Sequence, residues 1–331
     1  MWMNAEVFFV DMGKEGVTRS SIIELSIHDS LVRVQLVPGR VIPKLCFLGP
    51  EGSHTEEAMK TLLGVNTNWM DISPVAGNRQ VVKSVDSKGF DLGIVALVNA
   101  SGGSVTETQK AMVNAKETLI LGDIVIPVHH MLIGHSLDEI KRIYSHPQAL
   151  DQCGEFLDNN FKGVEFVATR STSEAVEEIV DRKDAAAVAS RDASEKFGVP
   201  ILKENIEDSH HNATRFLLIG RGETVPTGTD TTIFTFIPRT DQPGILADCL
   251  QVFKVHHINL SDIQTHQTGQ LDNHIFFAAL EGHMKDERVA HALELLGDYC
   301  SSVKVLGSYK RAPLPIGVKE PDYFNGDDKE S

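Results

Sequence analysis

The sequence predicts an α/β protein in two parts, an α/β segment over residues 44–220 and a βαββαβ segment over residues 231–309. Three observations predict this fold class. The chain has 331 residues, about twice the length of an average domain. Short apolar runs alternate with amphipathic stretches through residues 44–220, as in a sheet covered by helices. The stretch RGETVPTGTD, poor in apolar residues, predicts a linker over residues 221–230.

Residues 1–43 carry the weakest pattern, and we assign them as an N-terminal extension of unknown role. Apolar and polar residues alternate only in patches through SSIIELSIHDSLVRVQLVPGRVIP. This pattern predicts a hairpin, with Pro38-Gly39 as a turn signal.

The α/β segment is predicted from repeated strand–loop–helix units. Its first strand is Leu45–Leu48, and Ser53 with Glu56 three residues later forms a capping box that opens a helix. The later units are a strand at 92–98 before a helix at 106–114, a strand at 142–144 before a helix at 148–157, a strand at 164–168 before a helix at 174–181, a strand at 185–189 before a helix from 191, and a last strand at 214–219. In sheets of this kind ligands bind where strands end and helices begin.

The second segment has the order of a ferredoxin-like domain. Strands are predicted at 231–237, 258–266, 273–281 and 302–308, and helices at 243–254 and 286–298. Residues 310–331 are first rich in proline and then acidic, which predicts a flexible tail.

Composition narrows the class of partner and the compartment. With 31 Lys and Arg against 46 Asp and Glu, the net charge of −15 argues against nucleic acid as a partner but not against a small anion. No apolar run is long enough for a membrane span, and the start of the chain lacks the pattern of a secretory signal. The four cysteines are far apart and form no C-x-x-C, so we expect a reducing, cytoplasmic setting.

Three loop-to-helix junctions place hydroxyl groups and free backbone N–H groups at helix starts. They are Gly52-Ser53-His54-Thr55, Gly103-Ser104-Val105-Thr106 and Ser171-Thr172-Ser173. Helix N-termini favour anions, so three such ends facing one cleft would hold a small dicarboxylate. Taken alone, each junction is better explained by simple helix capping, for which serine and threonine are the standard residues.

The segment Asn212-Ala213-Thr214-Arg215-Phe216 offers a proton donor and a cation at the start of a strand. Thr214 could donate or orient a proton, and Arg215 could bind a carboxylate in bidentate fashion. Read alone, the segment is an ordinary strand start. The adjacent pairs His129-His130, His210-His211 and His256-His257 lack the i, i+4 spacing of a helical metal motif, so we expect no metal.

Several blocks in order resemble the prephenate dehydratase family. These blocks are FLGPEGSHTEEA at 47–58, SHPQAL at 145–150, STSEA at 171–175, ENIED at 204–208, and Asn212 with Thr214-Arg215-Phe216. The βαββαβ segment, with Asp241-Gln242-Pro243-Gly244-Ile245-Leu246 at its first turn, resembles the ACT domain of that family. The chain is identified as a member of this family over roughly residues 44–309.

The resemblance implies a two-lobed, periplasmic-binding-protein-like catalytic domain over residues 44–220 and an ACT regulatory domain over 231–309, in a homodimer or homotetramer. It implies a lyase that needs no cofactor and converts prephenate to phenylpyruvate, with loss of carbon dioxide and water, in phenylalanine biosynthesis. The favoured proton donor of the family carries over to Thr214. The substrate-binding residues implied beside it are Ser53, Thr55, Asn99, Ser104, Ser171, Thr172, Arg215 and Phe216.

Two departures from the family pattern bear on activity and regulation. The usual V-P-I-E-N-S reads Val95-Ala96-Leu97-Val98-Asn99-Ala100, so a carboxylate and a hydroxyl are missing. The effector motif E-S-R-P reads Gln264-Thr265-His266-Gln267, without the charges suited to an amino acid. An effector would bind through Gly244, Ile245, Leu246, Gln264, Thr265 and His266, and we expect a weak or absent response to phenylalanine.

Two alternatives remain open at this point. A diverged paralogue would act on prephenate or a related acid without dehydration, which the changes at Ala96, Val98 and Ala100 favour. A ligand-sensing protein without catalysis would keep only the cleft. The retained Thr214 argues against both.

Overall fold

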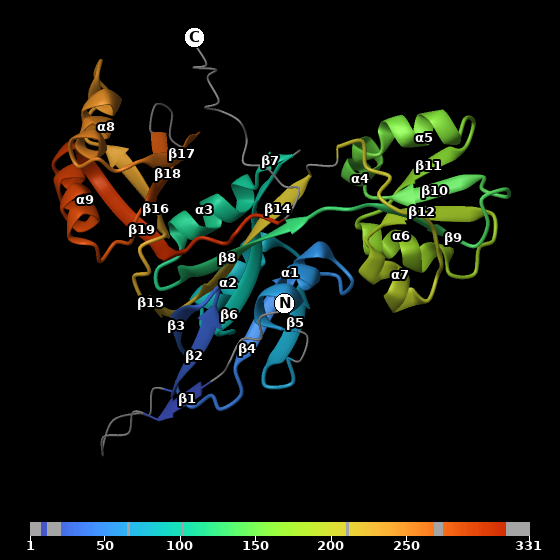
Figure 1. Ribbon diagram of the computed structural model, residues 1–331, viewed down its shortest axis with the longest axis horizontal. Coiled ribbons are helices and arrows are strands. Elements are labelled where there is room, and N and C mark those ends of the chain that lie inside the picture. Colours follow the sequence, from blue (N-terminus) through green and yellow to red (C-terminus); the bar gives the residue numbers. More distant parts are fainter. Residues whose placement is uncertain are drawn as a thin grey trace, which may run out of the picture.

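The structure is a computed structural model that describes residues 8–11, 21–64, 67–100, 102–209, 212–267 and 274–315. It has two α/β lobes and a C-terminal α/β unit, which lies on the far side of the first lobe from the second (Figure 1). The His210-His211 pair, most of the first 20 residues and residues 316–331 of the predicted tail lie outside the described residues.

The first lobe is built on a sheet of strand order β5-β4-β6-β14-β8, with the short β7 added beside β6. Its strands are β4 (Lys44–Leu48), β5 (Asp71–Val75), β6 (Leu92–Asn99), β7 (Gly103–Ser104), β8 (Leu119–Pro127) and β14 (Ala213–Gly220). Its helices are α1 (His54–Leu63), α2 (Asn78–Asp86) and α3 (Thr106–Asn114). Strands β4 and β6 run parallel, so their ends bring the loops before α1 and α3 to the same edge of the sheet.

The second lobe has the strand order β11-β10-β12-β9-β13. Its strands are β9 (Met131–Gly134), β10 (Arg142–Ser145), β11 (Glu165–Ala168), β12 (Ala185–Ala189) and β13 (Ile201–Lys203), and its helices are α4 (Pro147–Gln152), α5 (Gly154–Asn160), α6 (Thr172–Ile179) and α7 (Arg191–Phe197). All five residues of β12 are buried, as expected for a central strand with both faces covered.

The helix predicted at 148–157 is two short helices, α4 and α5. The carboxylate of Asp208 accepts hydrogen bonds from the backbone N–H groups of Glu155 and Phe156. These contacts cap a new helix start, so the backbone turns after Cys153 instead of continuing. The cause is a residue more than 50 positions away in the sequence.

The predicted N-terminal hairpin is present and belongs to the first lobe. Strands β2 (Ser21–Ile27) and β3 (Ser30–Gln35) join at His28-Asp29, both at positive φ, while Pro38-Gly39 lies beyond the hairpin. A four-stranded sheet of order β1-β2-β3-β15 results, with β1 (Phe8–Asp11) and β15 (Gly222–Thr224). Its apolar face shares one core with β4 and α1, and part of the predicted linker therefore forms a strand.

The C-terminal unit shows the predicted βαββαβ order. It comprises β16 (Asp230–Pro238), α8 (Ile245–Val255), β17 (Leu260–Gln267), β18 (His274–Glu281), α9 (Glu287–Tyr299) and β19 (Cys300–Lys310), with strand order β17-β18-β16-β19. Both helices cover one face of this sheet. The other face packs on the first lobe, where Ile233, Phe277 and Leu306 share a buried cluster with Ile120 and Leu217.

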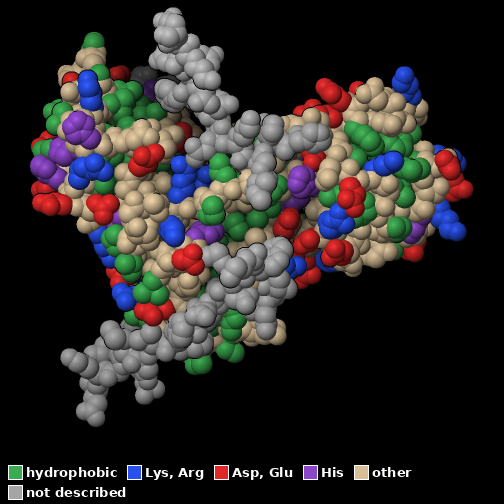
Figure 2. All heavy atoms as spheres, in the orientation of Figure 1, with side chains coloured by type: hydrophobic (Ala, Val, Ile, Leu, Met, Phe, Trp, Pro, Cys, Tyr) green, Lys and Arg blue, Asp and Glu red, His purple; other side chains and the backbone are tan. Residues whose placement is uncertain are grey.

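The described surface is mixed in charge. Acidic and basic side chains are interspersed over the visible face (Figure 2). Among the described residues, no helix is long and apolar enough to cross a membrane. All four cysteines are buried and free.

Candidate active site

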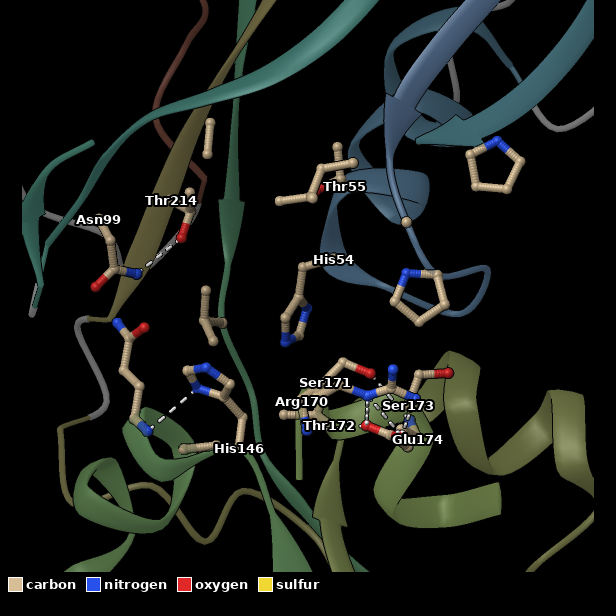
Figure 3. Close-up of a pocket in the computed structure, with 18 of the residues that line it drawn as sticks. His54, Thr55, Asn99, His146, Arg170, Ser171, Thr172, Ser173, Glu174 and Thr214 are labelled. Atoms are coloured by element: carbon tan, nitrogen blue, oxygen red, sulfur yellow. Dashed lines mark hydrogen bonds and ion pairs between the residues drawn. The ribbon is translucent and has the colours of Figure 1, made fainter. Parts of the chain in front are cut away.

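A cavity of about 850 Å³ lies between the two lobes. The first lobe contributes the loop before α1, the end of β6 and the start of β14, and the second contributes the starts of α4 and α6 (Figure 3). The chain crosses between the lobes after β8 and again before β14. The cavity thus lies at the carboxyl ends of parallel strands, where α/β folds bind ligands.

Thr214 lies in this cavity and is held by Asn99. Residue 214 pairs with residue 99 across β14 and β6, although 115 positions separate them. The Asn99 Nδ2 atom donates to Thr214 Oγ1 at 2.8 Å (Figure 3). It also donates to Asn212 Oδ1 at 3.1 Å. Because Oγ1 already accepts this hydrogen bond, the Thr214 hydroxyl proton is left to donate elsewhere.

Arg215 lies on the opposite face of β14. Successive side chains of a strand point to opposite faces, so Thr214 and Phe216 line the cavity while Arg215 does not. Its guanidinium forms an ion pair with Asp123 of β8, a fully buried carboxylate that also accepts from the backbone N–H of Ala312. This arrangement does not support the expected contact between Arg215 and the substrate.

Some of the predicted binding residues line the cavity and others lie outside its lining. Ser53 and Ser171 are both helix N-caps, and they accept hydrogen bonds from the backbone N–H groups of Glu56 and Glu174, respectively. The Ser53 hydroxyl also donates to the Leu48 carbonyl. The predicted residues that line the cavity are Thr55, Asn99, Ser171, Thr172, Thr214 and Phe216. Those outside its lining are Ser53, Ser104 and Arg215.

Two cations near the cavity are already neutralised by carboxylates. Arg170, at the rim, donates to Glu174 at 2.6 Å. Lys196 lies 3.3 Å from the Glu51 carboxylate and also donates to the Glu51 carbonyl. With these two cations engaged by carboxylates, the starts of α1 and α6 remain as groups on the cavity wall that favour an anion.

Neither His54 nor His130 was among the predicted site residues, and the pair His129-His130 was considered only as a metal motif. His54 and His130 both line the cavity, with ring centroids 6.1 Å apart and planes at 75°. Burial lowers the pKa of His130, an effect that its hydrogen bond to Gln152 partly offsets. Only the position of His54, directly after an N-cap at a predicted ligand-binding loop, could have drawn attention to it.

Only some of the residues predicted to bind an effector line a common cavity. A second cavity of about 460 Å³ lies at the first turn of the C-terminal unit, and Gly244, Ile245 and Leu246 line it. Gln264, Thr265 and His266 lie on β17, outside this lining. Gln264 instead accepts a hydrogen bond from Gln109 of α3 at 3.0 Å, so β17 contacts the first lobe.

Two α/β lobes enclose a cavity with hydroxyl groups and helix N-termini on its walls, an arrangement that favours a small anion. Residues 45–224, more than half of the chain, match the family model of prephenate dehydratase. The chain belongs to the prephenate dehydratase family.

Similar proteins agree over most of the chain. A bifunctional chorismate mutase/prephenate dehydratase of Aquifex aeolicus is 35% identical over 274 residues, which are 82% of this chain and 74% of that protein. A prephenate dehydratase of Methanocaldococcus jannaschii is 33% identical, over 78% of this chain and 95% of its own. The crystal structure of a prephenate dehydratase from Arthrobacter aurescens in complex with L-Phe superposes with a TM-score of 0.75 at 30% identity, covering 81% and 90% of the two chains.

Proposed function

We propose that this chain is a prephenate dehydratase, a carbon–oxygen lyase that forms phenylpyruvate. The bond from the ring to its carboxylate breaks, carbon dioxide leaves, and the electron pair completes the aromatic ring. The hydroxyl at the opposite ring carbon departs as water with a proton from Thr214, and the Thr214 oxygen then regains a proton from solvent. A threonine hydroxyl is a weak acid, so proton transfer is concerted with loss of the leaving group.

The observation that carries this proposal is the hydrogen bond from Asn99 to Thr214 inside the cavity between the lobes. This hydrogen bond fixes the position of the Thr214 hydroxyl and leaves its proton to be donated to a prephenate ring bound in the cavity. Three residues in or directly after β6 replace the proline, glutamate and serine of the family pattern. Of these, Ala96 lines the cavity, while Val98 and Ala100 lie outside its lining. This placement supports retained activity with prephenate.

The test incubates the purified chain with prephenate and follows both prephenate and phenylpyruvate, the latter by its absorbance in alkali. Turnover that falls at least about 100-fold in Thr214→Val supports the proposal. Consumption of prephenate without phenylpyruvate favours the diverged paralogue. Binding of prephenate without consumption favours a ligand-sensing protein.

The C-terminal unit is proposed to be an ACT-type regulatory domain with a weak or absent response to phenylalanine. Its βαββαβ order supports the assignment. The separation of Gln264, Thr265 and His266 from the cavity lined by Gly244 supports the weak response. Calorimetry that detects micromolar binding of phenylalanine would contradict it.

A cytoplasmic setting and a homodimer or homotetramer complete the proposal. The four buried, free cysteines support a reducing compartment. Light scattering of the purified chain measures the oligomeric state.

A further inference from the structure

Two imidazole rings meet in the cavity from different parts of the fold. His54 is the first residue of α1, and His130 lies in the connection between β8 and β9. The His54 Nε2 and His130 Nδ1 atoms are buried and have no hydrogen-bond partner within the described part of the chain. Figure 3 shows the His54 ring pointing into the space between Thr214 and the start of α6.

The other nitrogen of each ring fixes where its proton lies. His54 Nδ1 is 3.2 Å from the Glu57 carboxylate, which can only accept, so Nδ1 carries a proton. His130 Nε2 is 2.8 Å from the amide oxygen of Gln152, so Nε2 carries a proton there. In their neutral forms, therefore, His54 Nε2 and His130 Nδ1 each carry a lone pair, and a lone pair repels a carboxylate.

The two rings differ in their ability to take a second proton. His130 is 2% exposed, and burial lowers its pKa, so it stays neutral. His54 is half-buried, and its Nδ1 atom contacts the Glu57 carboxylate, so a positive charge on this ring would have a carboxylate partner. The other titratable side chains that line the cavity are His146, Arg170, Glu174, Glu177 and Lys196, and Glu207 lies behind His130 in contact with His129.

The cavity needs such a charge because three nearby cations have carboxylate partners. Arg170 contacts Glu174, Lys196 contacts Glu51, and Arg215 contacts Asp123 on the other face of the sheet. We propose that protonated His54 donates from Nε2 to a carboxylate of the substrate, so that binding of the dianion takes up one proton. This role rests on the proposed function, and it makes His54 a binding residue that senses pH.

The kinetic test measures KM and kcat for prephenate between pH 6 and 8.5. If binding takes up one proton, KM rises about tenfold per pH unit wherever the free enzyme has a neutral His54, while kcat changes little. His54→Gln keeps a neutral donor near Nε2, and His54→Asn keeps the contact to Glu57; both should make KM high and independent of pH. His135→Gln, at an exposed histidine of the second lobe, is the matched control and should retain the wild-type profile.

A second measurement separates this inference from the proposed function. Calorimetry of prephenate binding to Thr214→Val at pH 7.5, in two buffers of different ionisation enthalpy, should show net uptake of protons, at most one for each prephenate bound. The double variant with His54→Gln should show almost none. Equal uptake in both proteins, or no binding of prephenate, overturns the role of His54. If phenylpyruvate never forms but uptake depends on His54, the dehydratase proposal fails and the anion site stands.

Discussion

A hydrogen bond from Asn99 orients the hydroxyl group of Thr214, which is the proposed weak acid. Asn99 donates to Thr214 Oγ1 and accepts from the backbone N–H of Gly102 at 2.7 Å. Asn99→Ala removes the donor that orients the hydroxyl, so we expect kcat to fall about 10- to 100-fold with a small change in KM. Asn114→Ala, an exposed asparagine at the end of α3, should leave kcat unchanged. Equal kcat in wild type and Asn99→Ala would remove Asn99 from the mechanism.

We expect His130 to make the free energy of unfolding depend on pH. Burial lowers its pKa in the folded chain, whereas the unfolded chain takes up this proton near pH 6.5. Below that pH the unfolded state binds more protons, so the free energy of unfolding falls with acidification until the folded ring also titrates.

His130→Gln should flatten this dependence by up to about 1.4 kcal/mol per pH unit, as measured by urea denaturation at pH 7.5, 6.5 and 5.5. The exposed His135→Gln should keep the wild-type slope. An unchanged slope in His130→Gln would show that the buried ring does not carry the effect.

The sequence allowed the position of Thr214 to be predicted but not the partner of Arg215. Thr214 follows from the family resemblance, and its partner Asn99 is part of another matched segment. The partner of Arg215 is Asp123, 92 positions away on a neighbouring strand. Only the register between β14 and β8 shows that this pair forms, and the alternation along β14 then directs Arg215 away from the cavity.

At the level of elements, strand β19 approaches strand β8 closely at Gly307. A β-carbon at this position would lie 2.7 Å from the Ile120 β-carbon, closer than real side chains approach. Gly307→Ala should therefore separate β19 from β8 and lower the free energy of unfolding by about 1–3 kcal/mol in chemical denaturation.

Gly297→Ala is the matched control, because it lies in α9 with nothing near its missing β-carbon. It should stabilise the chain by about 0.5–1 kcal/mol, since alanine favours the helix. Equal effects of the two substitutions would contradict the close packing at Gly307.

Local patterns predicted most elements but not their assignment to units. The alternation at 21–35 indicated a hairpin, yet the partner of its apolar face includes Leu121 and Ile124 of β8. Residues 222–224 are polar enough to resemble a linker, and their pairing with β3 depends on a strand nearly 190 positions earlier. Contacts between segments that are distant in the sequence determine which unit each element joins. A local sequence pattern carries no information about such contacts.

For the whole molecule, the C-terminal unit and the first lobe share a buried core. Ile233, Phe277 and Leu306 pack against Ile120 and Leu217, and Lys304 donates to carbonyls at the end of α3. A chain that ends at Gly228 would expose this apolar surface to water. We expect it to aggregate or to bind a hydrophobic dye in size-exclusion and fluorescence measurements.

A truncated chain that stays monodisperse and melts cooperatively at the wild-type temperature would contradict this shared core. The contact also joins the C-terminal unit to α3, whose first residue directly follows Val105 in the cavity lining. An effector in the C-terminal unit would therefore have a direct physical connection to the catalytic lobes.

The most direct measurement is a crystal structure of Thr214→Val with prephenate bound. We expect the ligand in the cavity between the lobes, its ring hydroxyl next to residue 214, and its carboxylates at the start of α6 and near His54. A ligand bound only in the C-terminal unit, or with its hydroxyl remote from residue 214, would contradict the assignment of this cavity as the site of dehydration.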